Sequence, residues 1–136
     1  DTVSEFIHAT PKDFLIYSGN DTLTLPIMAL GGYGAISVAA HVAGPELRDL
    51  VAFASKGHFD QARELHFRLW DLLNALFMAP SPAPTKAALA FYGGAAGGVR
   101  LPLVDLDPAG REKLEAILVK TLGEPAGKPV ADLARA

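Results

Sequence analysis

The sequence predicts an α/β fold in which two parallel strand–helix units are followed by a helical extension. Two observations support this: short apolar runs alternate with helical patterns in the first part, and apolar spacing of three and four residues dominates the rest. We expect an opening helix over Thr2–Ala9, strand–helix units within 1–57, the helical extension over 58–123 and a flexible tail over 124–136. The chain has 136 residues, the length of one domain.

The first strand–helix unit begins with Phe14–Tyr17, an apolar run rich in β-formers that is typical of a strand buried on both faces. Gly19 ends this strand. Asn20 and Asp21 can then cap a helix over about 22–30, because their side chains accept hydrogen bonds from free N–H groups at a helix start.

The second unit follows a glycine stop. Gly31–Gly32 ends the helix, and a second buried strand is predicted over Ala35–Val38. Strand, helix and strand joined by short turns make a parallel crossover, and such units carry their chemistry at the C-terminal ends of the strands. Gly19 and Ile36–Ser37 are expected at those ends.

The remainder of the chain is predicted to be helical, with turns marked by glycine and proline. The sequence predicts helices over 44–57, 58–78, 85–92 and 109–122, the last capped by Asp107. Pro80–Pro84 is predicted to be an extended connector, because proline removes backbone donors and fixes φ.

A membrane helix is the competing interpretation of the first half. The stretch from Thr22 to Pro45 contains no Asp, Glu, Lys or Arg and is long enough to span a bilayer. Pro26 and three glycines within residues 31–34 interrupt it, and neither an aromatic belt nor a basic cluster flanks it. The buried crossover is therefore preferred, and no membrane partner is expected.

The composition bears on which partners the protein binds and on which cellular compartment it occupies. The net charge of −3 and the scattered Lys and Arg residues give no indication of nucleic-acid binding. The chain has no cysteine, so disulfides and thiolate metal sites are excluded. With no signal-type leader in the sequence, this composition favours the cytoplasm.

The predicted sheet is too small to stand alone. Two parallel strands leave both outer edges open, and sheets of this kind are normally covered on both faces. Since 50% of the residues are hydrophobic and the chain begins with Asp1, we expect either a partner that supplies more strands or a longer polypeptide.

Four segments resemble the dihydrodipicolinate synthase family in spacing and identity. They are Phe14–Asp21, Leu30–Val38, Phe77–Lys86 and Val99–Leu103. The resemblance covers nearly the whole chain, from about residue 1 to 123, and is specific for the wider family of pyruvate-dependent class I lyases. Ser-Pro-x-Pro-x-Lys and Arg-Leu-Pro-Leu favour the synthase over its N-acetylneuraminate lyase and keto-sugar aldolase relatives.

The resemblance implies that the chain is the last two βα units of a TIM (β/α)8 barrel plus a C-terminal helical extension, in an enzyme that is commonly a homotetramer. That enzyme joins pyruvate to aspartate semialdehyde on the way to diaminopimelate and lysine, through a Schiff base on a lysine. In the family this lysine lies a few residues before the position that matches Asp1. No catalytic residue is then expected in this chain, which alone is expected to be inactive, and no cofactor is expected.

The resemblance also carries over a few positions. Ile36 matches the pyruvate-contacting position at the end of the last strand, and Gly19 matches a backbone contact at the end of the preceding strand. Asn20 replaces the more usual aspartate, and Leu30 matches a position used in subunit packing. The alternative for Gly19 and Ile36 is structural: a tight-turn glycine and an aliphatic residue that fills the barrel.

Other polar residues have structural interpretations that we prefer. Lys86 has apolar neighbours that can lower a lysine pKa, but it lies beyond the strands, so a structural lysine, either snorkelling to solvent or paired, is expected. His41, just past the second strand, is expected to be a hydrogen-bonded loop histidine. His58 and His66 are eight residues apart and lack ligand spacing, so no metal site is expected.

Two other functions are open at this stage. One is a different pyruvate-dependent aldolase of the same family, acting on N-acetylneuraminate or a keto-sugar acid. The other is a non-catalytic oligomerisation fragment that keeps only the helical part.

Overall fold

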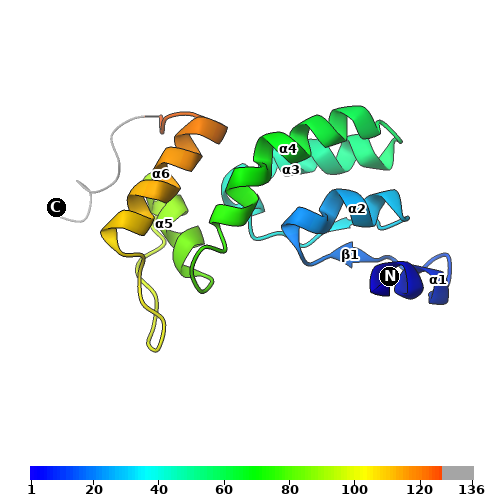
Figure 1. The fold of residues 1–136 in the computed structure, drawn as a ribbon, viewed down its shortest axis with the longest axis horizontal. Coiled ribbons are helices and arrows are strands. Elements are labelled where there is room, and N and C mark those ends of the chain that lie inside the picture. Colours follow the sequence, from blue (N-terminus) through cyan, green and yellow to red (C-terminus); the bar gives the residue numbers. More distant parts are fainter. Residues whose placement is uncertain (127–136) are drawn as a thin grey trace.

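The computed structural model describes residues 1–126, which form a mostly helical chain with one small sheet (Figure 1). The elements are α1 (Thr2–Ala9), β1 (Tyr17–Ser18), the 3-10 turn η1 (Asp21–Leu23), α2 (Thr24–Ala29), β2 (Gly34–Ala35), α3 (Ala40–Ser55), α4 (Phe59–Ala75), α5 (Ala83–Phe91) and α6 (Pro108–Leu122). The expected tail begins within this range, but residues 127–136 lie outside the described part of the chain.

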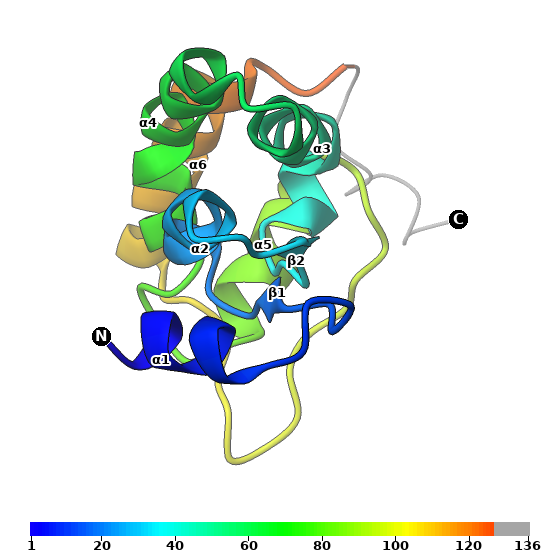
Figure 2. The ribbon, with the colours of Figure 1, turned by 90° about the vertical axis from the view of Figure 1, so that its right-hand side faces the viewer.

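The two strands and α2 lie toward one end of the elongated molecule, and α5 and α6 lie toward the other (Figure 1). Helices α3 and α4 run side by side and connect the two ends, while α5 and α6 pack together at the C-terminal end (Figures 1 and 2). A three-residue turn, 56–58, joins α3 to α4, and this short connection favours antiparallel packing of the two helices.

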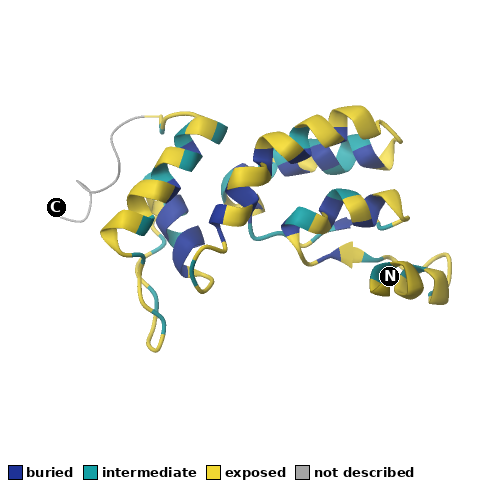
Figure 3. Ribbon diagram, in the orientation of Figure 1, coloured by how far each residue is buried: buried dark blue, intermediate teal, exposed yellow. Residues whose placement is uncertain are grey.

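The hydrophobic core has two parts that share α3 and α4. The main cluster joins α3, α4, α5 and α6, and its fully buried leucines are Leu69, Leu72, Leu76, Leu114 and Leu118. A smaller cluster of Met28, Ala54 and Ala62 joins α2, α3 and α4. The buried residues lie along the inward faces of these helices, while the outward faces are exposed (Figure 3). The α3–α4 pair therefore joins the strand–helix units to α5 and α6.

The predicted parallel crossover is confirmed. Strands β1 and β2 pair in parallel, with Tyr17 opposite Gly34 and Ser18 opposite Ala35. Both strands are shorter than predicted. The expected burial on both faces is wrong for this chain: Phe14 is 59% exposed and Leu15 is 51% exposed, because nothing within residues 1–126 covers them.

The glycine stop between α2 and β2 is confirmed and has a steric reason. Gly31 has a φ of 107°, which side chains rarely tolerate. Gly32 lies so close to α2 that a Cβ atom would be 2.9 Å from the carbonyl oxygen of Ile27. These two glycines let the chain reverse direction tightly enough for β2 to lie beside β1.

Several helix boundaries differ from those predicted. The helix expected over 22–30 is divided into η1 and α2, and the long helix expected to reach Met78 ends at Ala75. Helix α3 begins at Ala40 but is kinked at Ala43 (φ −126°, ψ 38°), so its regular part starts close to the predicted position. None of the helices in the described range is long and apolar enough to cross a membrane.

The proline-rich segment is not the extended connector that was predicted. The N–H of Ala83 donates to the carbonyl of Pro80 (3.1 Å), which closes a turn, and α5 begins at Ala83 itself. Pro84 lies in the first turn of α5, where the proline nitrogen needs no hydrogen-bond partner. The last helix follows the prediction, since Asp107 accepts a hydrogen bond from the N–H of Gly110 (2.7 Å) at the start of α6.

Truncation of a core leucine on α4 is expected to destabilise the whole molecule. Leu72 is fully buried in the main cluster, so Leu72→Ala should lower the free energy of unfolding by about 2–5 kcal/mol. Glu64→Ala, on the exposed face of the same helix, should change it by less than about 0.5 kcal/mol. Urea denaturation followed by circular dichroism measures both variants, and equal effects would contradict the assigned core.

Candidate functional site

The ends of β1 and β2 define one candidate site. Because the strands are parallel, both carboxyl ends lie at the same edge of the sheet. The N–H of Ile36 donates to the carbonyl of Ser18 (2.8 Å), which brings Ile36 beside the chain that leads into Gly19. Ile36 is 76% exposed and Gly19 has open space where a side chain would project. The two predicted residues thus lie together on an uncovered surface.

The loop after β1 is fixed by its own polar side chains. The hydroxyl of buried Ser18 donates to the carbonyl of Asn20 (2.7 Å) and accepts from the Asn20 N–H (3.2 Å). Asn20 Oδ1 accepts hydrogen bonds from the N–H of Thr22 (3.1 Å) and from its hydroxyl (2.8 Å). The predicted capping role of Asn20 is therefore confirmed, and its side chain is directed at the turn.

Asp21 does not cap its own helix as predicted. It is only 3% exposed, and its Oδ2 accepts a hydrogen bond from the N–H of Ala39 (2.9 Å), the residue that precedes α3. Its other oxygen, Oδ1, is buried without a hydrogen-bond partner in the described range. The partner lies 18 residues further along the chain, so no local sequence pattern indicates this contact.

Lys86 is a paired structural residue. Its ammonium group donates to the carbonyl oxygen of Gly98, in the loop between α5 and α6. This agrees with the structural interpretation. The contact holds the loop against α5, and the lysine is not at the strand ends.

The two histidines of interest differ from expectation. His41 is exposed in the first turn of α3, and its side chain makes no hydrogen bond to any residue within 1–126, so the prediction of a hydrogen-bonded loop histidine is wrong. His66 is buried on α4 beside the rings of Phe67 and Trp70, and its Nδ1 has no partner in the same range. Burial lowers the pKa of His66 below its ordinary value of 6.5.

Residues 1–126 contain no group of three or more His, Cys, Asp or Glu side chains that could hold a metal ion.

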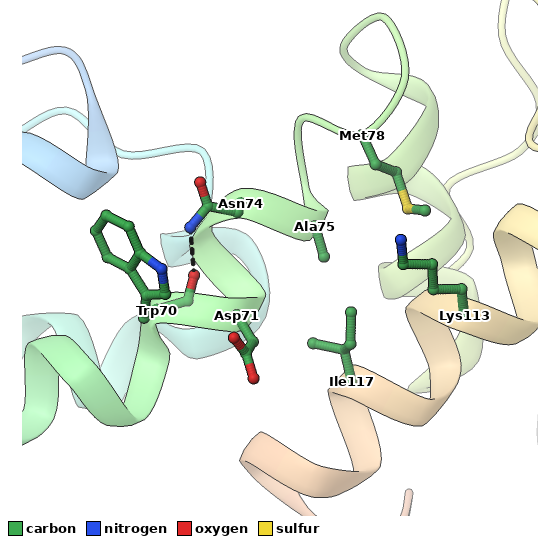
Figure 4. A pocket seen from close by; sticks show the side chains of 7 residues that line it. All are labelled: Trp70, Asp71, Asn74, Ala75, Met78, Lys113 and Ile117. Carbon is green, nitrogen blue, oxygen red and sulfur yellow. Dashed lines mark hydrogen bonds between the residues drawn. The ribbon is translucent and has the colours of Figure 1, made fainter.

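Of the surface clefts within residues 1–126, two lie against helices of the core. One, of about 300 Å³, lies between α4 and α6 and is lined by Trp70, Asp71, Asn74, Ala75, Met78, Lys113 and Ile117 (Figure 4). Its polar groups are partly engaged already: Asn74 Nδ2 donates to the Trp70 carbonyl (2.7 Å), and Asp71 pairs with Lys120 (2.8 Å). The other, of about 340 Å³, lies between the sheet and α3 and is lined in part by Tyr17, Tyr33 and Leu47. Neither cleft includes Gly19 or Ile36.

Comparison with known proteins gives a consistent match. The model described as "Dihydrodipicolinate synthetase family" matches residues 1–121. A 4-hydroxy-tetrahydrodipicolinate synthase of Listeria welshimeri is 49% identical over 118 residues, which are 87% of this chain and 40% of that protein. The chain thus spans about 40% of the length of the curated relatives that it matches.

Solved structures agree with the sequence match. The crystal structure of dihydrodipicolinate synthase from Aquifex aeolicus superposes with a TM-score of 0.83 at 40% identity, covering 87% of this chain and 40% of that one. The chloride-inhibited dihydrodipicolinate synthase from Acinetobacter baumannii, complexed with pyruvate, gives a TM-score of 0.83 at 34% identity, covering 88% of this chain and 41% of that one.

Burial of His66 predicts a pH-dependent contribution to stability. Because the folded pKa lies below 6.5, the unfolded chain binds a proton in a pH window where the folded protein does not. The contribution of His66 to stability is therefore complete above pH 6.5, falls as the pH drops through 6.5, and levels off below the folded pKa. The His66→Gln variant should lose less stability than the unmodified protein between neutral and mildly acidic pH in urea titrations. Equal losses would show that His66 is not buried in the neutral form.

Proposed function

Because the chain belongs to the dihydrodipicolinate synthetase family, we propose that it is the C-terminal part of a lyase that condenses pyruvate with aspartate semialdehyde. The observation that carries this proposal is the family match over residues 1–121. The parallel strands whose adjacent ends lead into Gly19 and Ile36 support it. The reaction belongs to diaminopimelate and lysine biosynthesis.

In this proposal β1 and β2 are the last two strands of a (β/α)8 barrel. Residues 1–57 complete the barrel, and residues 58–123 form the helical extension. The outer edges of the two-stranded sheet and the exposed side chains of Phe14 and Leu15 support the proposal, because six further strands and their helices would cover them.

The proposed chemistry requires a lysine that lies outside this chain. Its amine condenses with the keto group of pyruvate, water leaves, and loss of a methyl proton makes that carbon a nucleophile for the aldehyde carbon of the second substrate. Ile36 supplies apolar contact to the bound keto acid, and Gly19 supplies a backbone contact. The pyruvate complex of the Acinetobacter baumannii relative supports the choice of the first substrate.

The proposal includes an oligomer, which we take to be a homotetramer in the cytoplasm, with no cofactor. Leu30, at the C-terminal end of α2, is 48% exposed, and Leu23 before this helix and Tyr33 after it are also exposed. Exposed apolar side chains at both ends of one helix are suited to a subunit contact. This supports the role in packing that the family resemblance implies for Leu30.

Borohydride trapping separates the proposed lysine from Lys86. In the full-length protein, pyruvate and borohydride should label one lysine that precedes residue 1, detected by peptide mass spectrometry, because reduction fixes the imine. Lys86→Arg should be labelled to the same extent, since arginine can also donate to the Gly98 carbonyl. The present chain alone should not be labelled.

A pyruvate adduct on Lys86 would overturn this assignment of roles. Labelling of the full-length protein combined with turnover of a keto-sugar acid or N-acetylneuraminate, and none of aspartate semialdehyde, would favour a sibling aldolase. Absence of any label in the full-length protein would favour a non-catalytic oligomerisation protein.

A second test concerns the proposed contact between Ile36 and pyruvate. Ile36→Ala in the full-length protein should raise the KM for pyruvate by about tenfold or more, because each lost methylene in an apolar pocket weakens binding. Leu101→Ala, which removes an exposed aliphatic side chain from the loop between α5 and α6, is the matched control and should leave KM unchanged. Initial-rate kinetics measure both, and equal KM values would remove Ile36 from the site.

A further inference from the structure

The segment that follows β2 is fastened at two points on either side of its turn into α3. At one end the N–H of Ile36 donates to the carbonyl of Ser18 (2.8 Å). At the other end the N–H of Ala39 donates to Oδ2 of Asp21 (2.9 Å). Both acceptors belong to the chain at the end of β1. The path of residues 36–39 is therefore set by the neighbouring strand–helix unit.

The contact between Asp21 and Ala39 is the more specialised of the two. The Ile36 N–H donates to a backbone carbonyl, which any residue at position 18 would supply. The Ala39 N–H donates to a side-chain oxygen, so this contact depends on the identity of residue 21. Asp21 is only 3% exposed, and Ala39 is fully buried. A hydrogen bond between a charged group and an N–H away from water is stronger than a neutral one at the surface.

The second oxygen of the Asp21 carboxylate is also informative. This oxygen, Oδ1, is buried and has no hydrogen-bond partner within residues 1–126. A buried acceptor without a partner is unfavourable, and in native proteins such a group usually has a reason to be there. The hydrogen bond from the Ala39 N–H to Oδ2 is the favourable contact that Asp21 gains at this buried position.

We propose that Asp21 is a positioning residue for the keto-acid site, which acts by fixing the segment 36–39 and so the placement of Ile36. This inference rests on the proposed function, in which Ile36 contacts pyruvate. Asp21 itself does not touch the substrate in this scheme. Its carboxylate fixes the position of the segment that carries Ile36.

Two variants of Asp21 separate anchoring from charge. Asp21→Asn keeps an oxygen that can accept from the Ala39 N–H, whereas Asp21→Ala removes the acceptor. In the full-length protein, Asp21→Ala should raise the KM for pyruvate by about tenfold, because a small misplacement of a positioning group weakens binding. Asp21→Asn should stay within about twofold of the unmodified protein.

Asp107→Ala is the matched control. Asp107 also accepts a backbone N–H hydrogen bond, from Gly110 (2.7 Å), but at the start of α6 and away from the strand ends. Its loss should lower the melting temperature and leave KM unchanged. If Asp21→Ala likewise lowers only the melting temperature, Asp21 is merely structural and the inference is overturned.

Amide hydrogen exchange tests the anchoring without relying on activity. The Ala39 amide should exchange faster in Asp21→Ala than in the unmodified protein and be protected again in Asp21→Asn, whereas unchanged exchange in Asp21→Ala would overturn the inference. Trapping of the unmodified protein with pyruvate and borohydride is run in parallel. Failure of that trapping overturns the proposed function and the substrate role of Asp21 with it, even where exchange still shows the anchor.

Discussion

The packing of α4 is the interaction on which the rest of the molecule depends. The two strands share so short a ladder that their own hydrogen bonds cannot fix them. They are held because α2 and α3, which follow them, both pack on α4 in the smaller cluster. The other part of the buried face of α4 enters the main cluster with α5 and α6. Together with α3, which also has residues in both clusters, α4 thus links the strand–helix units to α5 and α6.

The elements that could be predicted from the sequence are those whose signals are local. Helix α1, the glycine stop at 31–32 and the caps by Asn20 and Asp107 all involve partners within five residues, and all agree with the structure. What could not be predicted depends on distant or missing partners. The bond from Ala39 to Asp21 spans 18 residues, and the burial expected around Phe14 needs covering elements that residues 1–126 do not supply.

The candidate site was predictable in position and not in detail. Glycine and apolar runs place Gly19 and Ile36 at strand ends, and parallel pairing brings them together. The segment that carries Ile36 has no Asp, Glu, Lys or Arg between residues 22 and 45, and the nearby carboxylate of Asp21 is buried. An apolar surface of this kind can contact a small keto acid and exclude water. A cationic side chain to bind the carboxylate of that keto acid has to come from another segment.

Ala39 belongs to two systems at once. Its methyl group is part of the main cluster, and its amide is bound to Asp21. A larger side chain at this position would have to push either the core leucines or its own backbone, and the core is too densely packed to yield freely. The helical core and the segment that carries Ile36 are therefore unable to diverge independently here. For an engineer who repacks that core to gain thermostability, residue 39 is where the redesign would displace the segment at the end of β2 and, under the proposed function, change substrate selectivity.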